Sequence, residues 1–313
     1  MRVLVTGAAG FTGLRMMELL AGQRGVTPLG LVRRQVPDDC RKPDSFIMGD
    51  LLNRDDLQEV VTTCCPDAVI HLAGLTRGTL DALYATNVTG TKNLLDASIA
   101  ANPGCRILVV SSSAVYGYAG DVPIPETAPL QPVGDYGTSK VAQEILALDY
   151  QNRGAVIAIA RPFNLAGPGQ PGSFVCGRIV KQVVEIEKET RIAIELHEIT
   201  SARDLIDVRD VVRGYWAIVS HPDFTRDCSG KAFNLGSGNA YLLSEIVTMV
   251  EEITGKHYEI RLPETPPAIP VPTQRSNNTR ITSLTGWKPE IPMRDTLRDM
   301  LIMERQKKRS GIK

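Results

Sequence analysis

The sequence lacks an excess of either charge sign, a long apolar run and a leader segment. Its 35 basic and 35 acidic side chains balance to a formal net charge of zero. A nucleic-acid-binding protein normally carries a basic excess or a basic stripe, so that class is excluded. No apolar run approaches the roughly 18 residues that a membrane-spanning helix needs. Residues 1–6 have the pattern of a strand, so we expect no signal peptide and a cytoplasmic protein.

Cysteine and histidine are also scarce, at six and four residues. No CxxC pair or Cys/His cluster has the spacing of a zinc site, so we expect no metal. We interpret the cysteines as buried small apolar residues in a reducing compartment. They are Cys40, Cys64, Cys65, Cys105, Cys176 and Cys228.

The first half of the chain alternates short Val/Ile/Leu-rich runs with helical patterns. Continuously apolar strands are buried on both faces, as in a parallel sheet with helices on each side. The pattern predicts an α/β fold with a doubly wound parallel sheet, the Rossmann fold. The expected strands are 2–5, 29–32, 68–72, 106–110 and 156–160, and the expected helices are 14–21, 55–61, 88–101 and 139–151.

Regularity falls after Phe163, where a Gly/Pro-rich loop follows at 167–172 and residues 263–272 carry five prolines. A helix at 208–220 and a strand at 232–235 are expected to return to the sheet. We therefore predict a large domain and a smaller C-terminal α/β lobe. The large domain would comprise residues 1–163 plus 207–237, and the lobe residues 164–206 plus 238–313.

A G-x-x-G-x-x-G turn lies between the first expected strand and the first expected helix. Its glycines, Gly7, Gly10 and Gly13, let a pyrophosphate approach the N-terminus of the helix, where unpaired N–H groups favour anions. This context predicts a dinucleotide site. At the end of the second strand an NAD enzyme places a carboxylate, whereas this chain has Arg33 and Arg34, which favour the 2′-phosphate of NADP.

Asp50 and Leu51 follow the third strand and are placed to contact the adenine. A plain helix cap before Asp55 is an equally good interpretation of this pair. Both interpretations stay open at this point.

Tyr136 and Lys140 form a Y-x-x-x-K motif, whose two side chains share one helix face. We expect the ammonium and an oxidised nicotinamide together to lower the pKa of the phenol, which then exchanges a proton with a substrate oxygen. In the reducing direction Tyr136 would protonate the alkoxide formed from a carbonyl. Three serines at 111–113 follow an apolar strand, and ligands bind at the carboxyl ends of such strands.

These motifs together resemble the extended short-chain dehydrogenase/reductase family, the NAD-dependent epimerases and dehydratases of nucleotide sugars. The match extends over nearly the whole chain, with HLAG at 71–74, RPFN at 161–164, RDLIDVRDVV at 203–212, FNLGSG at 233–238 and TGWKP at 285–289. The resemblance implies Ser112, Tyr136 and Lys140 as the catalytic residues.

The resemblance also implies NADP(H) in the large domain, with NAD less expected, and a nucleotide-diphosphate sugar in the lobe. The implied cofactor-binding residues are Gly7, Gly10, Phe11, Thr12, Gly13, Arg33, Arg34, Asp50, Leu51, Leu72, Ala73, Gly74, Asn87, Tyr136, Lys140 and Pro162. The implied substrate-binding residues are Ser112, Ser113, Asn164, Phe174, Val175, Arg203 and Arg275. Two arginines and an asparagine suit a diphosphate. Phe174 would lie against the nucleobase or pack in the core.

Departures from the family's other patterns narrow the reaction. The dehydratases resemble S-T-D-E-V-Y-G, and this chain has Ser113 and Ala114 in place of the two carboxylates. Elimination of water would therefore lack its acid and base. The synthases of GDP-fucose have a cysteine at the position of Ala114 and a later histidine, whereas no histidine lies between His71 and His197. We expect neither dehydration nor epimerisation at the other carbons.

A 4-keto reductase and a 4-epimerase remain. Residues 161–175 and 274–280 resemble the reductases that convert GDP-4-keto-6-deoxy-D-mannose to GDP-D-rhamnose, which we therefore expect. The alternatives are an NAD-dependent UDP-sugar 4-epimerase and a reductase of a dTDP-sugar. A third hypothesis, an inactive NADPH-binding sensor, predicts that the Ser-Tyr-Lys trio is broken, whereas the trio is intact in this sequence. The family also implies a homodimer through the helices at 88–101 and 139–151, with contacts from Leu94, Leu95, Ile99, Ile145 and Leu146.

Overall fold

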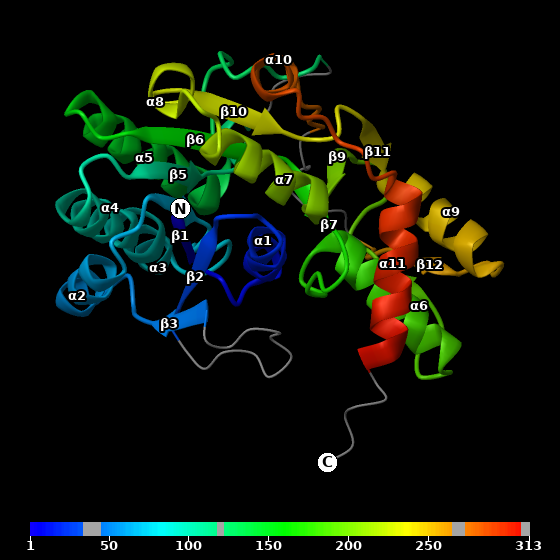
Figure 1. The fold of residues 1–313 in the computed structure, drawn as a ribbon. Coiled ribbons are helices and arrows are strands. Elements are labelled where there is room, and N and C mark those ends of the chain that lie inside the picture. Colours follow the sequence, from blue (N-terminus) through cyan, green and yellow to red (C-terminus); the bar gives the residue numbers. More distant parts are fainter. Residues whose placement is uncertain (34–44, 118–121, 265–272, 308–313) are drawn as a thin grey trace.

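A computed structural model describes residues 1–33, 45–117, 122–264 and 273–307 (Figure 1). Its largest element is a seven-stranded sheet in which every neighbouring pair is parallel. The predicted α/β class with a parallel, doubly wound sheet is therefore confirmed. Across the sheet the strands are β10 (Ala232–Leu235), β6 (Ile157–Pro162), β5 (Arg106–Val110), β4 (Ala68–His71), β1 (Arg2–Thr6), β2 (Thr27–Val32) and β3 (Phe46–Met48).

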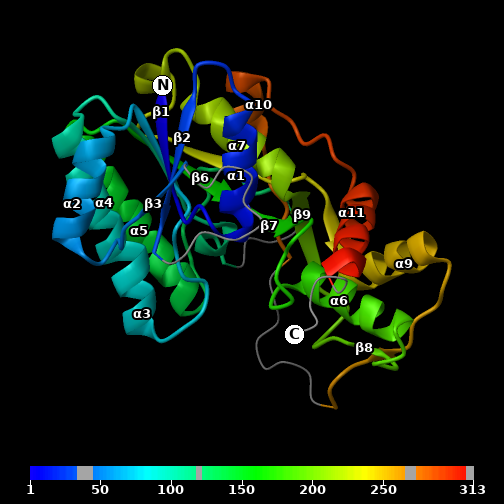
Figure 2. The ribbon, with the colours of Figure 1, turned by 60° about the horizontal axis from the view of Figure 1, so that its bottom comes forward.

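Helices cover both faces of this sheet, as Figure 2 shows. One face carries α2 (Arg54–Cys64), α4 (Gly90–Ala101) and α5 (Gly134–Asn152), and the other carries α1 (Phe11–Ala21) and α7 (Val208–Val219). Successive side chains of a strand point to opposite faces. Accordingly, Val3 and Val5 pack in the core with α1 and α7, whereas Leu4 packs in the core with α2 and α4. Burial on both faces explains why the strands are continuously apolar.

The predicted elements are present with shifted ends. The helix expected from residue 14 begins at Phe11, directly after the glycine-rich turn. A π-helical turn, Ala85–Thr89, precedes α4, and the helix expected from residue 139 begins at Gly134. Tyr136 therefore lies in the first turn of α5, on one helix with Lys140 as the Y-x-x-x-K motif predicts.

A second group of elements follows β6 and has a hydrophobic core of its own, to which Val183, Ile246 and Leu297 belong. The sequence predicted none of its helices individually, and the predicted domain boundaries stay a prediction. Its helices are α6 (Val175–Glu187), α9 (Leu243–Thr254) and α11 (Met293–Gln306). Its strands are β7 (Asn164–Ala166), β9 (Ala202–Asp207) and β11 (Ala240–Leu242) in one sheet, and β8 (Ile194–Glu195) and β12 (Ile260–Arg261) in another. Three further short helices complete the described elements of the chain as a whole: α3 (Leu80–Tyr84), α8 (Phe224–Asp227) and α10 (Thr279–Thr285).

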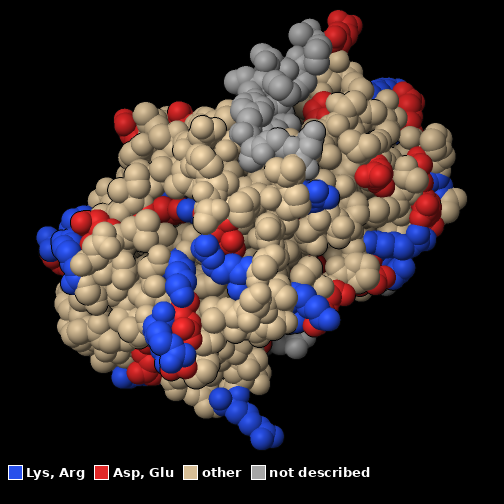
Figure 3. Space-filling view, turned by 90° about the horizontal axis from the view of Figure 1, so that it is seen from above, with Lys and Arg blue, Asp and Glu red and all other residues tan. Residues whose placement is uncertain are grey.

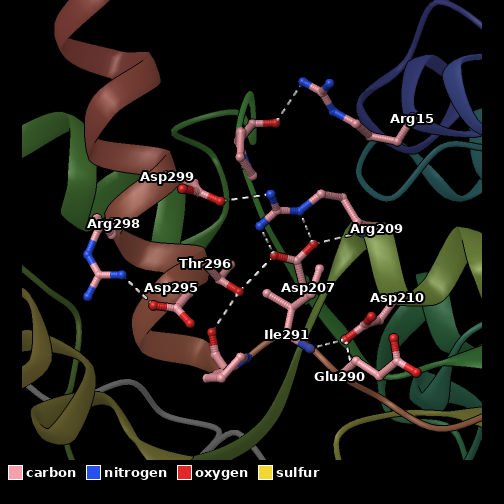
Figure 4. Close-up of polar contacts among 12 residues, drawn as sticks. Arg15, Asp207, Arg209, Asp210, Glu290, Ile291, Asp295, Thr296, Arg298 and Asp299 are labelled. Carbon is pink, nitrogen blue, oxygen red and sulfur yellow. Dashed lines mark hydrogen bonds and ion pairs between the residues drawn. The ribbon is translucent and has the colours of Figure 1, made fainter.

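Buried carboxylates fasten α11 to the junction of β9 and α7 (Figure 4). Asp207 accepts hydrogen bonds from Thr296 Oγ1 at 2.7 Å and from the Arg209 guanidinium at 2.8 Å. The same guanidinium reaches Asp299 at 2.7 Å. Asp210 accepts two backbone N–H groups of the segment before α11. These bonds join α11 and the segment before it to the end of β9, the strand that carries Arg203.

The surface agrees with the balanced charge of the sequence. On the face in Figure 3, basic and acidic side chains are intermixed over several elements. Among the described residues, no helix is long and apolar enough to cross a bilayer. Cys105, Cys176 and Cys228 are buried as expected, whereas Cys64 and Cys65 are only half-buried at the end of α2. Cys40 lies outside the described residues.

Candidate active site

A cavity of about 780 Å³ lies where the glycine-rich turn, the ends of β4, β5 and β6 and the loop before α6 meet. Ligands of open α/β sheets bind at this carboxyl edge of the strands. The volume lies in the range of ordinary small-molecule sites. This cavity is therefore the candidate active site.

The glycine-rich turn forms a cradle in which side chains are excluded by contact with the backbone. Gly7 has a φ of +66°, and a β-carbon there would lie 2.9 Å from the backbone of Ala73. A β-carbon at Gly13 would lie 2.1 Å from the carbonyl oxygen of Gly7. The bare backbone and the N-terminus of α1 fit the pyrophosphate of a dinucleotide. Gly7, Gly10, Phe11, Thr12 and Gly13 all line the cavity, as do Leu72, Gly74 and Pro162.

The predicted catalytic trio converges on the same cavity. Ser112 directly precedes a short 3-10 turn after β5, where its hydroxyl accepts a hydrogen bond from the Ala114 N–H at 3.1 Å. Tyr136 and Lys140 come from successive turns at the start of α5. The Lys140 ammonium donates to the Val110 carbonyl at 2.8 Å and to Gln143 Oε1 at 2.6 Å. A strand end and a helix face thus bring hydroxyl, phenol and ammonium together.

Burial governs the ionisation of Tyr136 and Lys140 in the chain without cofactor. Burial raises the pKa of Tyr136, and a hydrogen bond with Ser112 opposes this only in part. Burial lowers the pKa of Lys140 to about 8, against the raising effect of the Glu144 carboxylate. The expected lowering of the Tyr136 pKa by Lys140 and an oxidised nicotinamide concerns the protein with its cofactor bound, and it stays a prediction. A phenol with a raised pKa is a proton donor at neutral pH.

The opposite wall of the cavity carries Asn164, Phe174, Val175 and Arg203. Arg203 pairs with Glu198 at 3.3 Å, and its buried Nε has no hydrogen-bond partner among the described residues. A buried guanidinium N–H without a partner is costly and fits an anionic ligand. Phe174 is 39% exposed, so packing in the core is not its role.

Six further predicted residues lie away from the cavity lining, and their roles stay predictions. They are Arg33, Asp50, Leu51, Ala73, Asn87 and Arg275. Arg34 lies outside the described residues.

The surroundings of these residues differ. Arg33 is exposed at the end of β2, and Leu51 is in the core. Asp50 is not the cap of α2, because Asn53 accepts the Asp56 N–H there. Asn87 is fully buried behind the wall, where it bonds both backbone groups of Leu75.

The remaining two, Ala73 and Arg275, are also not part of the lining. The N–H of Ala73 donates to Thr6 Oγ1 at 3.1 Å. Arg275 has a buried, unpartnered Nε like that of Arg203, although it is not in the lining. It therefore stays a candidate anion ligand.

Sequence reasoning missed about half of the lining, including the polar residues Arg77, Gln274 and Tyr215. Arg77 donates to the Ser173 carbonyl at 2.9 Å across the cavity, and Gln274 donates to the Gly117 carbonyl at 2.9 Å. Tyr215 is fully buried, with a hydroxyl that has no partner among the described residues. The strand-end rule applied to β4 would have found Arg77. Gln274 begins the segment 274–280 that carried the resemblance, but no chemistry in the sequence pointed to it or to Tyr215.

Comparison with known proteins covers nearly the whole chain. A sequence model of the NAD dependent epimerase/dehydratase family matches residues 3–236. GDP-6-deoxy-D-mannose reductase of Pseudomonas aeruginosa is 33% identical over 96% of each chain. UDP-glucose 4-epimerase 3 of Oryza sativa subsp. japonica is 28% identical over 95% of this chain and 88% of its own length. The structure of RMD from Pseudomonas aeruginosa complexed with NADPH has a TM-score of 0.83 at 30% identity, over 97% of this chain and 98% of that one.

Proposed function

The chain belongs to the NAD dependent epimerase/dehydratase family and is an NAD(P)-dependent oxidoreductase, and from this premise we propose that it reduces a nucleotide-linked 4-keto-6-deoxy sugar. The family resemblance expected from the sequence is thereby confirmed, with NADP(H) as the favoured cofactor. The proposed substrate is GDP-4-keto-6-deoxy-D-mannose and the proposed product is GDP-D-rhamnose. The observation that carries the proposal is the convergence of Ser112, Tyr136, Lys140 and Arg203 on the cavity beside the glycine-rich turn.

In this proposal NADPH, when bound, supplies a hydride to the keto carbon. The Tyr136 hydroxyl, which is protonated at neutral pH, donates its proton to the oxygen of that carbonyl. The Ser112 hydroxyl orients the same oxygen. Lys140 uses two of its three N–H groups within the described chain, which leaves one for the ligand side of the cavity.

The substrate's diphosphate would be held by Arg203, Asn164 and Arg275. The orphaned Nε atoms of both arginines support this assignment, because an anion would satisfy them. Phe174, with its exposed ring at the cavity, would lie against the nucleobase. The choice of guanine rests on the 33% identical relative, whose name specifies a GDP-sugar.

The test is the loss of NADPH absorbance after addition of GDP-4-keto-6-deoxy-D-mannose, with NADH and the dTDP-keto sugar in parallel. We expect rapid consumption of NADPH that is selective for the GDP-sugar. Tyr136→Phe should abolish it. Tyr116→Phe should retain it, because Tyr116 is buried outside the cavity lining.

The 4-epimerase is the competing function, since a 28% identical relative carries that name. It would retain NAD and interconvert UDP-glucose and UDP-galactose without net consumption of cofactor. Protein that purifies with bound NAD and consumes no NADPH with any keto sugar would refute the reductase.

We also propose a cytoplasmic homodimer that pairs α4 and α5 of two copies. Ile145 supports this, because it is 62% exposed on α5. Leu94 and Leu95 were expected in the contact, but both are fully buried in the chain's own core, so that expectation is wrong. Ile145→Asp should convert the dimer to a monomer in sedimentation, and a wild type of 34 kDa at micromolar concentration would refute the dimer.

A further inference from the structure

Gln143 links the Lys140 ammonium to a buried hydrogen-bond chain behind the cavity. Its Oε1 accepts from Lys140 Nζ at 2.6 Å, and its Nε2 donates to Thr91 Oγ1 at 2.7 Å. Gln143 and Thr91 are fully buried, and Lys140 is 5% exposed. Gln143 lies one helical turn after Lys140, so both side chains share a face of α5.

The number of available protons fixes which group donates in each of these hydrogen bonds. Thr91 has a single hydroxyl proton, which it gives to the Asn87 carbonyl at 2.6 Å. Gln143 Nε2 and His71 Nε2, the latter at 2.9 Å, must therefore both donate to Thr91 Oγ1. His71 then carries its proton on Nε2 and accepts the Thr6 hydroxyl proton at Nδ1, over 2.7 Å.

This arrangement permits one orientation of the Gln143 amide. A flipped amide would turn its NH₂ toward the Lys140 ammonium and its oxygen toward a hydroxyl whose proton is already used. His71 does not disturb the arrangement, because burial, with a contribution from the Lys140 charge, lowers its pKa to about 3. The acceptor that faces Lys140 is therefore fixed at neutral pH.

Few charged or titratable groups lie near the Lys140 ammonium. Glu144 lies on the same helix and is itself paired with Arg161 on β6 at 2.6 Å. Neutral His71 faces Lys140 from β4, and Tyr136 precedes it on α5. From β5 it meets only the Val110 carbonyl. Two neutral oxygens, one of them from Gln143, thus compensate directly for the lost hydration of the ammonium.

We propose that Gln143 is a positioning residue that holds the Lys140 ammonium at the cavity wall and keeps it charged at neutral pH. The inference rests on the proposed function, in which Lys140 serves both the cofactor and the reaction. The Thr91–His71–Thr6 chain acts through Gln143, since it sets which end of the amide Lys140 meets.

The test is the affinity for NADPH, followed by protein fluorescence from pH 6 to 10, with kcat/KM for the keto sugar measured alongside. The wild type should lose affinity as the pH rises through about 8, because Lys140 then loses its proton. Gln143→Leu removes an oxygen that accepts a hydrogen bond from the Lys140 ammonium, which lowers the pKa of Lys140. The loss of NADPH affinity should therefore occur about one pH unit lower than in the wild type. Gln143→Glu adds a carboxylate beside the ammonium, so the loss should move above the wild-type pH, while the Thr91 hydroxyl turns its proton from the Asn87 carbonyl to the second carboxylate oxygen.

Gln182→Leu is the matched control. Gln182 is equally enclosed, at 5% exposure, and both ends of its amide bond the backbone of Glu195, at 2.7 and 3.1 Å, outside the cavity lining. This variant should lower Tm without moving the pH dependence.

Opposite shifts of the Leu and Glu variants distinguish positioning from a structural role. Shifts in the same direction, no shift, or a wild type without pH dependence would each overturn the inference. Should Gln143→Leu not fold, Gln143→Glu retains an oxygen toward Lys140 and decides alone by the direction of its shift. A wild type that binds NADPH but reduces no keto sugar would refute the proposed function and leave this binding test intact.

Discussion

The carbonyl oxygen of Gly7 lies where a side chain at Gly13 would begin. A β-carbon at Gly13 would be 2.1 Å from that oxygen and 2.7 Å from the Ala8 Cα. The first turn of α1 can therefore approach the end of β1 because one carbon atom is missing. This close approach shapes the cradle that faces the cavity.

Gly13→Ala is expected to push the helix away from the turn and weaken NADPH binding at least tenfold, since backbone atoms cannot yield as a flexible side chain would. Gly22→Ala, beyond the other end of α1, is the control. A β-carbon there would meet only the Leu19 carbonyl at 3.5 Å, and its φ of −89° suits any residue. Titration of both variants with NADPH, followed by fluorescence, checks this. Equal affinities of the two would contradict the prediction.

Local chemistry explains why this part of the site could be predicted. The turn, the serines after β5 and the Tyr136–Lys140 pair each lie within a few residues in the sequence and at a strand or helix end. Gln274 and Tyr215 gave no such signal, because elements distant in the sequence bring them to the lining. Gln143 is only three residues from Lys140, yet its role depends on Thr91 of another helix.

The fold likewise has a part that could be predicted from the sequence and a part that could not. The continuous apolar strands revealed the parallel sheet, because burial on both faces leaves a direct mark on composition. Helices α6, α9 and α11 pack mainly against one another, and their assignment depends on partners far along the chain. Leu94 and Leu95 illustrate the limit, since an apolar helix residue can face its own sheet or a second copy. Here both are in the chain's own core.

Arg33 tests the cofactor preference. Arg33 is exposed at the end of β2, where the 2′-phosphate that distinguishes NADPH from NADH is expected to bind. Arg33→Ala should weaken NADPH binding about tenfold and leave NADH unchanged, as loss of a charge-assisted contact implies. Arg24→Ala, an exposed arginine before the opposite end of β2, should change neither. An equal effect of Arg33→Ala on both cofactors would place its contact elsewhere.

Two buried tyrosines should respond to the same substitution with opposite signs. Tyr215 has a hydroxyl without a partner among the described residues, so Tyr215→Phe should raise the unfolding free energy by about 1 kcal/mol. The Tyr116 hydroxyl donates to Asn234 Oδ1 at 2.7 Å and accepts from Arg161 at 2.9 Å. Tyr116→Phe leaves both partners unsatisfied and should cost about 1–3 kcal/mol. Urea titration of the ligand-free protein measures both, and destabilisation by Tyr215→Phe would indicate a partner for its hydroxyl.

Glu144 and Arg161 form a buried ion pair between α5 and β6, 2.6 Å apart with side chains 1% and 7% exposed. Glu144→Gln keeps the shape but leaves the guanidinium charge uncompensated, so the unfolding free energy should fall by about 3–5 kcal/mol. Asp149→Asn on the same helix breaks a pair with Arg153 that is 2.5 Å long but about 60% exposed on both sides. It should change stability far less, because water already screens that pair.

The double variant Glu144→Leu/Arg161→Met tests whether the loss comes from the unpaired charge. Removing both charges should recover part of the stability lost in Glu144→Gln, since well-packed apolar residues often replace a buried ion pair at little cost. Recovery will be incomplete, because Arg161 also donates to the Glu126 carbonyl and to Tyr116. Urea denaturation of the wild type, of Glu144→Leu and Arg161→Met made singly, and of the double variant gives the coupling free energy between the two side chains. A double variant less stable than Glu144→Gln would mean that hydrogen bonding and shape, rather than charge, hold α5 against β6.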